Sequence, residues 1–208
     1  MHYITSTGVS IYYNRYTFPE VSVAGLGSLY PATDSSFGYG CSKLINERFL
    51  ERVHELYELP ICIYRPSSII RNGFDATTAQ AQLGWVNALL YYVRTIGAAP
   101  KAEHNRGALD LIRVESCCAD VLKNITRGQP RKEFKYMNQV GDIVISMNLL
   151  HHMDTDKGRR YDLLPLGEWI SKAIEAGLNP AVAMLIQGMD EPGRPDYPKL
   201  IRVKGIME

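Results

Sequence analysis

A long amphipathic stretch between two short apolar runs is the feature that most limits what this chain can fold into. Over residues 36–58 apolar side chains recur every three or four positions with charged residues between them. This spacing predicts a half-buried helix whose apolar stripe faces the core. The runs on either side, residues 2–4 and 60–64, are short and continuous, as in buried parallel strands. The order strand, helix, strand predicts an α/β fold with a doubly wound parallel sheet. The residues of the helical stripe are Ile45, Phe49, Val53 and Leu56.

The later segments continue this alternation and then become mainly helical. The expected elements are helices over residues 79–97 and 115–127 and strands over residues 108–114 and 134–138. Three further helices are expected in the tail. The first runs from an N-cap at Asp142 to about His151, the second covers residues 166–176, and the third has Asn179 as its N-cap and Pro180 at its first position.

Composition places the chain among ordinary globular proteins. Its 208 residues are 46% hydrophobic and carry a formal net charge of +1, so no basic surface predicts binding to nucleic acid. No run approaches the roughly 18 to 20 apolar residues that a membrane helix needs, and the first residues do not form a signal peptide. We therefore expect a cytoplasmic protein that does not enter a membrane.

Neither the cysteines nor the histidines predict a metal site. The four cysteines have no Cys-x-x-Cys spacing and are expected to be buried thiols. His151 and His152 are adjacent, so on a helix their rings would point roughly 100° apart and could not easily share an ion. The cysteines are Cys41, Cys62, Cys117 and Cys118.

The pair Tyr39 and Lys43 lies at the start of the long predicted helix. Four residues on a helix make one turn, so the phenol and the ammonium group should lie on the same face. The positive charge favours the phenolate, which suits a tyrosine that gives and takes a proton in catalysis. With 13 tyrosines in the chain, ~0.6 such pairs arise by chance, so the place of this pair between the two strands carries the argument.

Taken in order, these segments resemble the extended short-chain dehydrogenase/reductases. The resemblance rests on the strand-end hydroxyls Thr5 to Thr7, the Tyr39–Lys43 pair and the Arg65-Pro66 that closes the next strand. It implies that Thr7 holds the substrate carbonyl, with Ser6 or Thr5 as alternatives, that Tyr39 protonates its oxygen, and that Lys43 holds the nicotinamide ribose. The resemblance also places four residues along the nicotinamide: Pro66, Ser67, Ser68 and Ile69.

Three longer segments, residues 38–43, 106–115 and 169–180, look like the terminal reductase domain of fungal polyketide and nonribosomal peptide synthetases. That family uses NADPH to release an acyl or peptidyl thioester from a phosphopantetheinylated carrier protein as an aldehyde or alcohol. The resemblance implies a partial Rossmann-like fold, with a catalytic part over residues 1–70. Residues 71–208 would hold the remaining sheet elements and a helical substrate-binding region.

A complete member of this family also carries a glycine-rich turn before the catalytic tyrosine, which holds the dinucleotide pyrophosphate. Only Gly25-Leu26-Gly27 echoes it, so the nucleotide-binding part is expected to be missing and NADPH binding to be weak. Two other functions therefore stay open. One is a Dieckmann-type cyclase that releases a tetramic acid without redox chemistry, and the other is a catalytically silent fragment that binds a carrier protein.

Several other residues have two interpretations. Trp85, Tyr91 and Tyr92 are packing residues or line an acyl channel. Two cationic groups are solvated surface or dock an acidic carrier protein. The first group is Arg127, Arg131 and Lys132, and the second is Lys157, Arg159 and Arg160.

Overall fold

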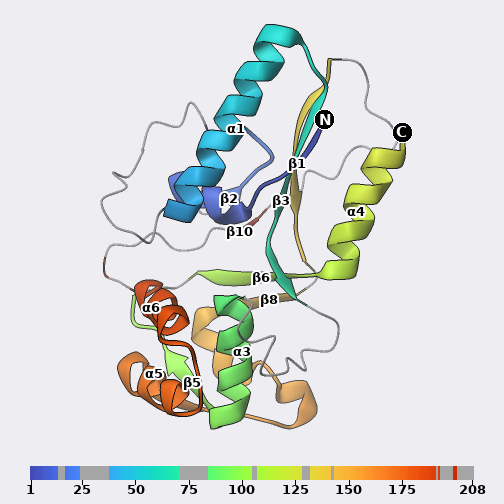
Figure 1. Ribbon diagram of the computed structural model, residues 1–208. Helices are drawn as coiled ribbons and strands as arrows, with labels where there is room; N and C mark the ends of the chain where they lie inside the picture. Colours follow the sequence, from blue (N-terminus) through green and yellow to red (C-terminus); the bar gives the residue numbers. More distant parts are fainter. Residues whose placement is uncertain are drawn as a thin grey trace. The chain divides into compact units, whose positions relative to one another are not determined.

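The computed structural model describes residues 1–13, 17–23, 38–70, 84–104, 107–127, 132–141, 143–190, 192 and 199–200 (Figure 1). The chain divides into two units, and neither is one continuous segment. The first unit comprises Met1–Ile69, Asp110–Ile143 and Pro198–Glu208. The second unit comprises Ile70–Leu109 and Val144–Tyr197.

The first unit is built on a parallel sheet with the order β1-β3-β7. Its strands are β1 (His2–Ile4), β3 (Ile61–Pro66) and β7 (Phe134–Gln139). Tyr3 is in register with Ile63, which is in register with Tyr136. Every residue of β3 is buried, because strands pair with both of its edges and helices cover both of its faces. The parallel strands expected from the apolar runs are therefore confirmed.

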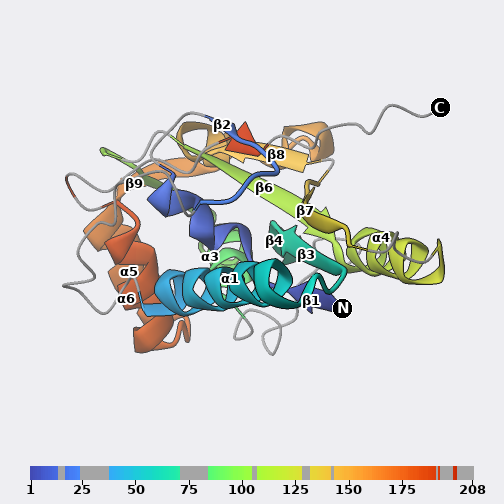
Figure 2. The same ribbon diagram turned by 90° about the horizontal axis from the view of Figure 1, so that it is seen from above.

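Helices α1 (Gly38–Tyr57) and α4 (Val114–Arg127) lie on opposite sides of this sheet (Figures 1 and 2). Side chains alternate along β3, so Ile61 and Ile63 pack with Leu50 of α1, whereas Cys62 and Tyr64 pack on the side of α4. A 3-10 helix, η1 (Thr7–Tyr12), follows β1, and strands β2 (Thr17–Phe18) and β10 (Lys199–Leu200) form a small parallel pair. These layers are those of a doubly wound α/β fold.

The sequence predicted the helix α1 correctly but assigned the wrong face to the core. Ile45, Phe49 and Leu56 are 61%, 64% and 56% exposed, so most of the predicted stripe points away from the sheet. The buried residues are Gly40, Leu44, Glu47 and Leu50. The prediction failed because the buried face contains a glutamate and is less regular in its hydrophobicity than the outer face.

Two of the four cysteines are buried, namely Cys62 and Cys117, and burial raises the pKa of both thiols. Cys41 is half-buried. Cys118 is exposed on α4, so its predicted burial is wrong, because the side of α4 turned from the sheet includes this position. All four are free thiols.

The second unit packs three helices around a short parallel pair of strands. The helices are α3 (Trp85–Ile96), α5 (Leu166–Glu175) and α6 (Pro180–Gly188), and the strands are β5 (Ala98–Lys101) and β9 (Asp162–Pro165). Trp169 is fully buried and its Nε1 donates to the carbonyl of Ala98 at 2.7 Å. Asn179 caps α6 as predicted, since its side chain accepts from the backbone N–H of Ala181 at 2.8 Å.

The helix expected from Asp142 to about His151 is not present. Strand β8 (Ile143–Ser146) comes first and a 3-10 helix, η3 (Met147–His152), follows it; a short 3-10 helix, η4 (Thr155–Lys157), comes next. Ile143, Val144 and Ile145 favour a strand, and β8 joins a sheet of order β4-β6-β8. The other strands of this sheet are β4 (Ser68–Ile70) and β6 (Ala108–Arg113), and the tail is therefore less helical than expected. Asp142 itself and residues 79–83 of the expected second helix lie outside the described residues.

A buried polar network links the segment that follows η3 to the helix α3. The Arg94 guanidinium donates two hydrogen bonds to the Asp154 carboxylate, at 2.7 and 2.8 Å. The hydroxyl of Tyr161 donates a third at 2.6 Å. These contacts, chiefly those from Arg94, lower the pKa of Asp154 to about 2. No helix in the described part of the chain is long and apolar enough to cross a membrane.

Candidate functional site

The residues predicted to carry the chemistry meet where β1 and β3 end and α1 begins. The carboxyl ends of parallel strands lie at the same edge of a sheet, and the backbone N–H of Thr5 donates to the carbonyl of Tyr64 at 2.8 Å. Ser6 and Thr7 therefore emerge beside the end of β3, where Pro66 and Ser67 follow. The strand order thus brings together segments that are about sixty residues apart in the chain.

Tyr39 and Lys43 lie one turn apart at the start of α1. The Nζ of Lys43 is 5.6 Å from the centroid of the Tyr39 ring, so a positive charge stands beside the phenol as expected from the spacing. Tyr39 is 61% exposed, whereas Lys43 is half-buried. The phenol is therefore open to an incoming molecule.

The hydroxyl of Ser6 and the ring of Tyr39 approach the same point above Gly8. A Cβ added to Gly8 would lie 3.3 Å from the Oγ of Ser6 and 3.6 Å from Cε1 of Tyr39, the ring carbon next to the one that bears the hydroxyl. Ser6 is held in place as the N-cap of η1, where its Oγ accepts from the N–H of Gly8 at 3.0 Å. The lack of a side chain at Gly8 thus leaves room next to both groups.

The other two hydroxyls of this segment have different surroundings. The Oγ1 of Thr7 donates to the carbonyl of Pro66 at 3.2 Å, which ties the start of η1 to the end of β3. The Oγ1 of Thr5 is buried and has no hydrogen-bond partner among the described residues. Sequence position favours Thr7 for the contact with substrate, whereas the structure places the Oγ of Ser6 and the ring of Tyr39 next to the same glycine, Gly8.

The segment predicted to lie along a nicotinamide begins buried and ends exposed. Ser67 is buried and its N–H donates to the carbonyl of Gln139 at 3.1 Å, but its Oγ finds no partner in the described part of the chain. Ser68 is half-buried and Ile69 is 42% exposed. An unpaired buried hydroxyl is costly unless a ligand or a water molecule completes its hydrogen bonds.

One buried ion pair next to the site was not predicted. Arg65, at the end of β3, meets Glu47 of α1 through two hydrogen bonds, from Nε to Oε1 at 3.1 Å and from Nη2 to Oε2 at 2.7 Å. Its Nη1 also donates to the carbonyl of Val21 at 2.8 Å, and its guanidinium lies 4.0 Å from the centroid of the Tyr136 ring. Glu47 follows Lys43 by one helical turn, which is the signal that could have placed it on the same side of α1.

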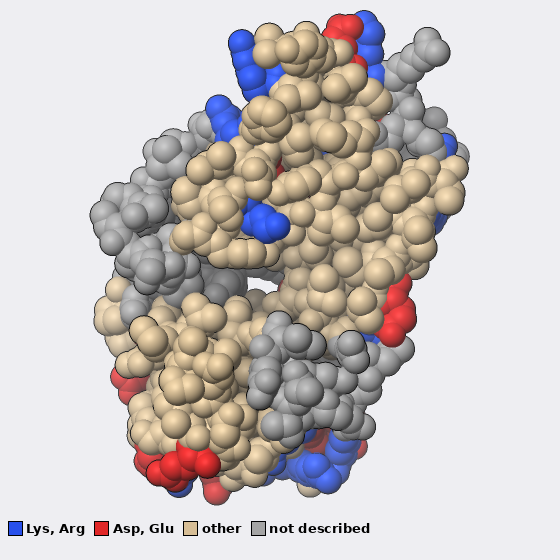
Figure 3. Space-filling model, viewed as in Figure 1, with Lys and Arg blue, Asp and Glu red and all other residues tan. Residues whose placement is uncertain are grey.

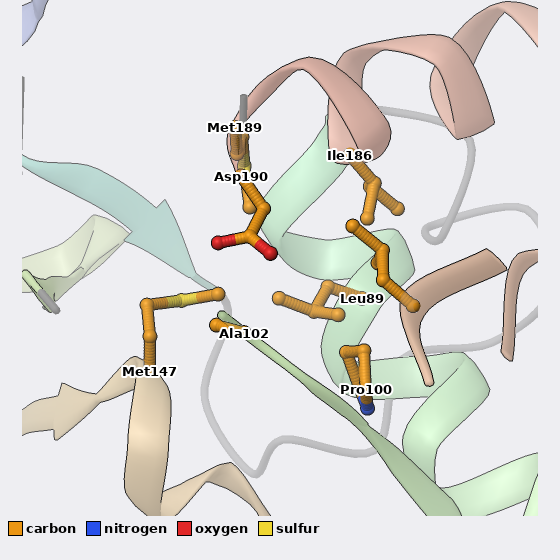
Figure 4. Close-up of a pocket in the computed structure, with 8 residues that line it drawn as sticks. Leu89, Pro100, Ala102, Met147, Ile186, Met189 and Asp190 are labelled. Carbon is orange, nitrogen blue, oxygen red and sulfur yellow. The ribbon is translucent and has the colours of Figure 1, made fainter. Parts of the chain in front are cut away.

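In the second unit, α3, β5, η3, α5 and α6 enclose a small apolar pocket (Figure 4). It encloses about 10 Å³, room for roughly one water molecule, and is far smaller than a site for an acyl chain. Tyr92 is buried and packs edge-on against Tyr91, with ring centroids 5.0 Å apart. The pocket residues are Leu89, Pro100, Ala102, Met147, Leu166, Ile186, Met189 and Asp190.

Of the cationic groups, Lys132 forms an exposed ion pair with Glu58 at 2.5 Å, and Arg127 is exposed at the end of α4. The second group, Lys157, Arg159 and Arg160, is exposed after η3. Three predicted features lie outside the described residues: Gly25-Leu26-Gly27, Arg106 and Arg131.

Comparisons with known proteins agree with this arrangement. A family described as "Male sterility protein", whose name marks it as NAD-binding, matches residues 27–121. The highly reducing polyketide synthase sthA of Phaeosphaeria nodorum is 45% identical over 202 residues, which are 97% of this chain but only 7% of that protein. The chain thus spans a small fraction of the length of this relative.

Solved structures show the same fold. The terminal R domain from the myxalamid PKS-NRPS pathway matches 97% of this chain with a TM-score of 0.63 and 18% identity, and the match covers 49% of that domain. A thiolation-reductase di-domain from an archaeal nonribosomal peptide synthetase matches 91% of this chain with a TM-score of 0.54, 17% identity and 39% coverage. At these identities the likeness is one of fold. The resemblance expected from the sequence is confirmed: the chain is related to a segment of fungal polyketide synthases and has the Rossmann-like fold of the terminal reductase domains.

Proposed function

We propose that this chain supplies the catalytic part of an NADPH-dependent thioester reductase, which releases a carrier-bound polyketide or peptide as an aldehyde or alcohol. The observation that carries the proposal is that Ser6 and Tyr39 both lie next to Gly8 after β1, with Lys43 beside the ring of Tyr39. The polyketide synthase relative and the fold of a thiolation-reductase di-domain support the choice of a carrier-bound substrate.

In this proposal the chain's own residues hold the carbonyl oxygen of the thioester. Tyr39 donates a hydrogen bond to that oxygen, and Ser6 or Thr7 donates a second, so negative charge on it is stabilised. Lys43 supplies a positive charge beside the phenol. The C–S bond then breaks, the pantetheine thiolate leaves and takes up a proton, and the aldehyde remains. In a second round Tyr39 gives its proton to the aldehyde oxygen to form the alcohol.

The nicotinamide, when bound, supplies the hydride that each round adds to the carbonyl carbon. Lys43 and the segment from Pro66 to Ile69 would hold it, and the unpaired Oγ of Ser67 fits a hydrogen bond to its carboxamide. As the family resemblance implies, we assign the substrate chain to the segments after residue 70.

The test is to incubate the chain with NADPH and an acyl-pantetheine thioester, following NADPH absorbance and identifying products by mass spectrometry. An aldehyde or alcohol formed with matching loss of NADPH supports the proposal. The control is Tyr39→Phe, which keeps the exposed ring and removes the proton, and which should lower turnover by roughly 10²- to 10⁴-fold.

Two other outcomes would overturn the reductase. A cyclised product without loss of NADPH would establish the Dieckmann-type cyclase. Binding of an acylated carrier protein with no product of either kind would leave a carrier-binding fragment.

A further inference from the structure

Three exposed cationic side chains lie close together in the second unit, shortly after the buried Asp154. They are Lys157, Arg159 and Arg160, and together they form the basic turn. Asp156 is the one acidic residue between positions 155 and 160. Figure 3 shows Lys and Arg side chains gathered at the lower right of the second unit. The turn therefore sets three positive charges against one negative charge.

Backbone hydrogen bonds hold the basic turn in place. The N–H groups of Lys157 and Arg159 both donate to the carbonyl of Asp154, at 3.0 and 3.1 Å. Gly158 lies between them with a φ of +69°, a left-handed conformation that glycine adopts without strain. The cations therefore project from a fixed backbone, so a partner that binds them loses little affinity to the ordering of a loop.

The buried Asp154 does not neutralise the basic turn, because its charge is already matched inside the unit. Its carboxylate accepts two hydrogen bonds from the Arg94 guanidinium, at 2.7 and 2.8 Å, and one from the hydroxyl of Tyr161. Among the described residues, no carboxylate lies within ion-pair distance of a cation of the turn. The positive charge is thus left to face solvent or a partner.

The other cationic group predicted from the sequence has less charge to offer. Lys132 is already paired with Glu58 at 2.5 Å. Arg127 lies in the last turn of α4, at the negative end of the helix dipole. The basic turn also belongs to the part of the chain after residue 70, to which the substrate chain is assigned. Of the two groups, it is therefore the stronger candidate for a docking surface.

We propose that the basic turn docks the carrier protein that delivers the thioester, by contact with acidic side chains on the surface of that carrier. The inference rests on the proposed function, which requires a carrier-bound substrate. A carrier must bind and leave once for each product. Exposed charges suit such a contact, because they speed association more than they add lasting affinity.

The spread of the three cations favours a protein face over a single phosphate group. The charge of Lys157 acts on the carboxylate of Asp154. The charge of Arg160 acts on the ring of His151 instead. The cations thus border different side chains and do not converge on one point. Several separate carboxylates match such a spread, whereas tight binding of one phosphate needs donors that converge on it.

Calorimetric titration of the 208-residue chain with a purified acidic carrier domain tests the proposal. We expect Lys157→Glu/Arg160→Glu to weaken binding by at least about tenfold at low salt, because like charges then meet across the contact. High salt should weaken the wild-type complex, since exposed charges are screened over roughly 10 Å at 0.1 M ionic strength.

The matched control is Lys123→Glu/Arg127→Glu, which changes the net charge by the same amount at two exposed positions on α4. It should leave the affinity for the carrier within about twofold of the wild type. Circular dichroism checks that both variants are folded. Three results would overturn the proposal: no binding of the carrier to the wild type, an unchanged affinity in folded Lys157→Glu/Arg160→Glu, or an equal loss in both variants.

The carrier without its pantetheine arm separates the two possible sources of negative charge. It should bind as well as the complete carrier and lose affinity equally in Lys157→Glu/Arg160→Glu. Binding by the complete carrier alone, displaced by free phosphopantetheine, would assign the turn to the phosphate of the arm and contradict the proposed contact with carboxylates.

Turnover of an acyl-pantetheine thioester distinguishes failure of this inference from failure of the proposed function. That substrate has no carrier, so its turnover in Lys157→Glu/Arg160→Glu should equal that of the wild type, while the KM for a carrier-bound thioester rises. A chain that turns over the small thioester and does not bind the carrier would overturn the docking surface alone. A chain that binds the carrier through the turn and reduces neither substrate would overturn the reductase alone.

Discussion

Arg65 and Glu47 join β3 to α1 through a two-point ion pair that is closed to solvent, with side-chain exposures of 0% and 1%. The pair links the strand that ends at Pro66 to the helix that begins with Tyr39 and Lys43. It therefore sets the distance between the two elements that carry the proposed chemistry. A buried pair of this kind is costly to break from one side, because the remaining charge keeps no partner.

Replacing Arg65 with alanine should lower the free energy of unfolding by about 3 to 5 kcal/mol, since Glu47 would stay buried and unpaired. Urea denaturation followed by circular dichroism measures the change. Lys172→Ala is the comparison, because it removes an ion pair with Glu168 that is half exposed on both sides and should cost about 1 kcal/mol or less. Equal effects of the two variants would contradict the structural role given to Arg65.

The hydroxyls beside Tyr39 can be separated by mutation. Ser6→Ala should lower turnover by roughly 10²- to 10³-fold, as for the loss of one donor to a developing negative charge. Thr7→Val should have a smaller effect on turnover, because the Thr7 hydroxyl is already engaged with the Pro66 carbonyl. Rates with a thioester substrate at saturating NADPH make the comparison. If Thr7→Val proves the more damaging variant, the substrate contact belongs to Thr7, as its sequence position indicates.

Acid should weaken the second unit through Asp154. Its folded-state pKa is lowered from 3.8 to about 2, so its contacts with Arg94 and Tyr161 stabilise the fold above the unfolded pKa. That stability, roughly 2 kcal/mol at neutral pH, should be lost as the pH falls from about 4 to 2. Urea denaturation of the wild type and of Asp154→Asn between pH 7 and pH 2.5 tests this. The difference between the two proteins should shrink toward acid pH, and a constant difference would refute the prediction.

Gly141 should not tolerate a side chain. A Cβ at this position would lie 1.7 Å from the carbonyl oxygen of Leu111, so the backbone would have to move. The N–H of Gly141 also donates to the Asp110 carboxylate at 2.7 Å. We expect Gly141→Ala to cost about 2 to 4 kcal/mol of stability by urea denaturation. Gly167→Ala, where a Cβ meets open space at the start of α5, should be neutral or stabilising by up to about 1 kcal/mol.

The sequence predicted where helices and strands occur better than it predicted which of their side chains are buried. Apolar periodicity revealed α1, but α1 carries two apolar stripes, and the more regular one faces outward. The ion pair of Glu47 with Arg65 was not predicted, because no local pattern connects two residues that are eighteen positions apart. The partner of a buried charge is decided by the packing of the sheet, which periodicity does not describe.

The candidate site was likewise predicted only where a local spacing decides the geometry. Tyr39 and Lys43 could be placed together because one helical turn fixes their separation. The choice among Thr5, Ser6 and Thr7 could not be made in this way, because it depends on how the chain turns after β1 into η1. β8 was taken for helix because its few apolar residues suit either element, and pairing with β6 decides between them.

The way the chain passes between its two units limits how proteins of this kind can be recombined. The second unit is made from two separate stretches, and its strands β5 and β9 come one from each. A chimera that exchanged only one stretch would therefore pair a β5 from one protein with a β9 from another. A functional exchange of this unit between related proteins therefore requires that both stretches be replaced together.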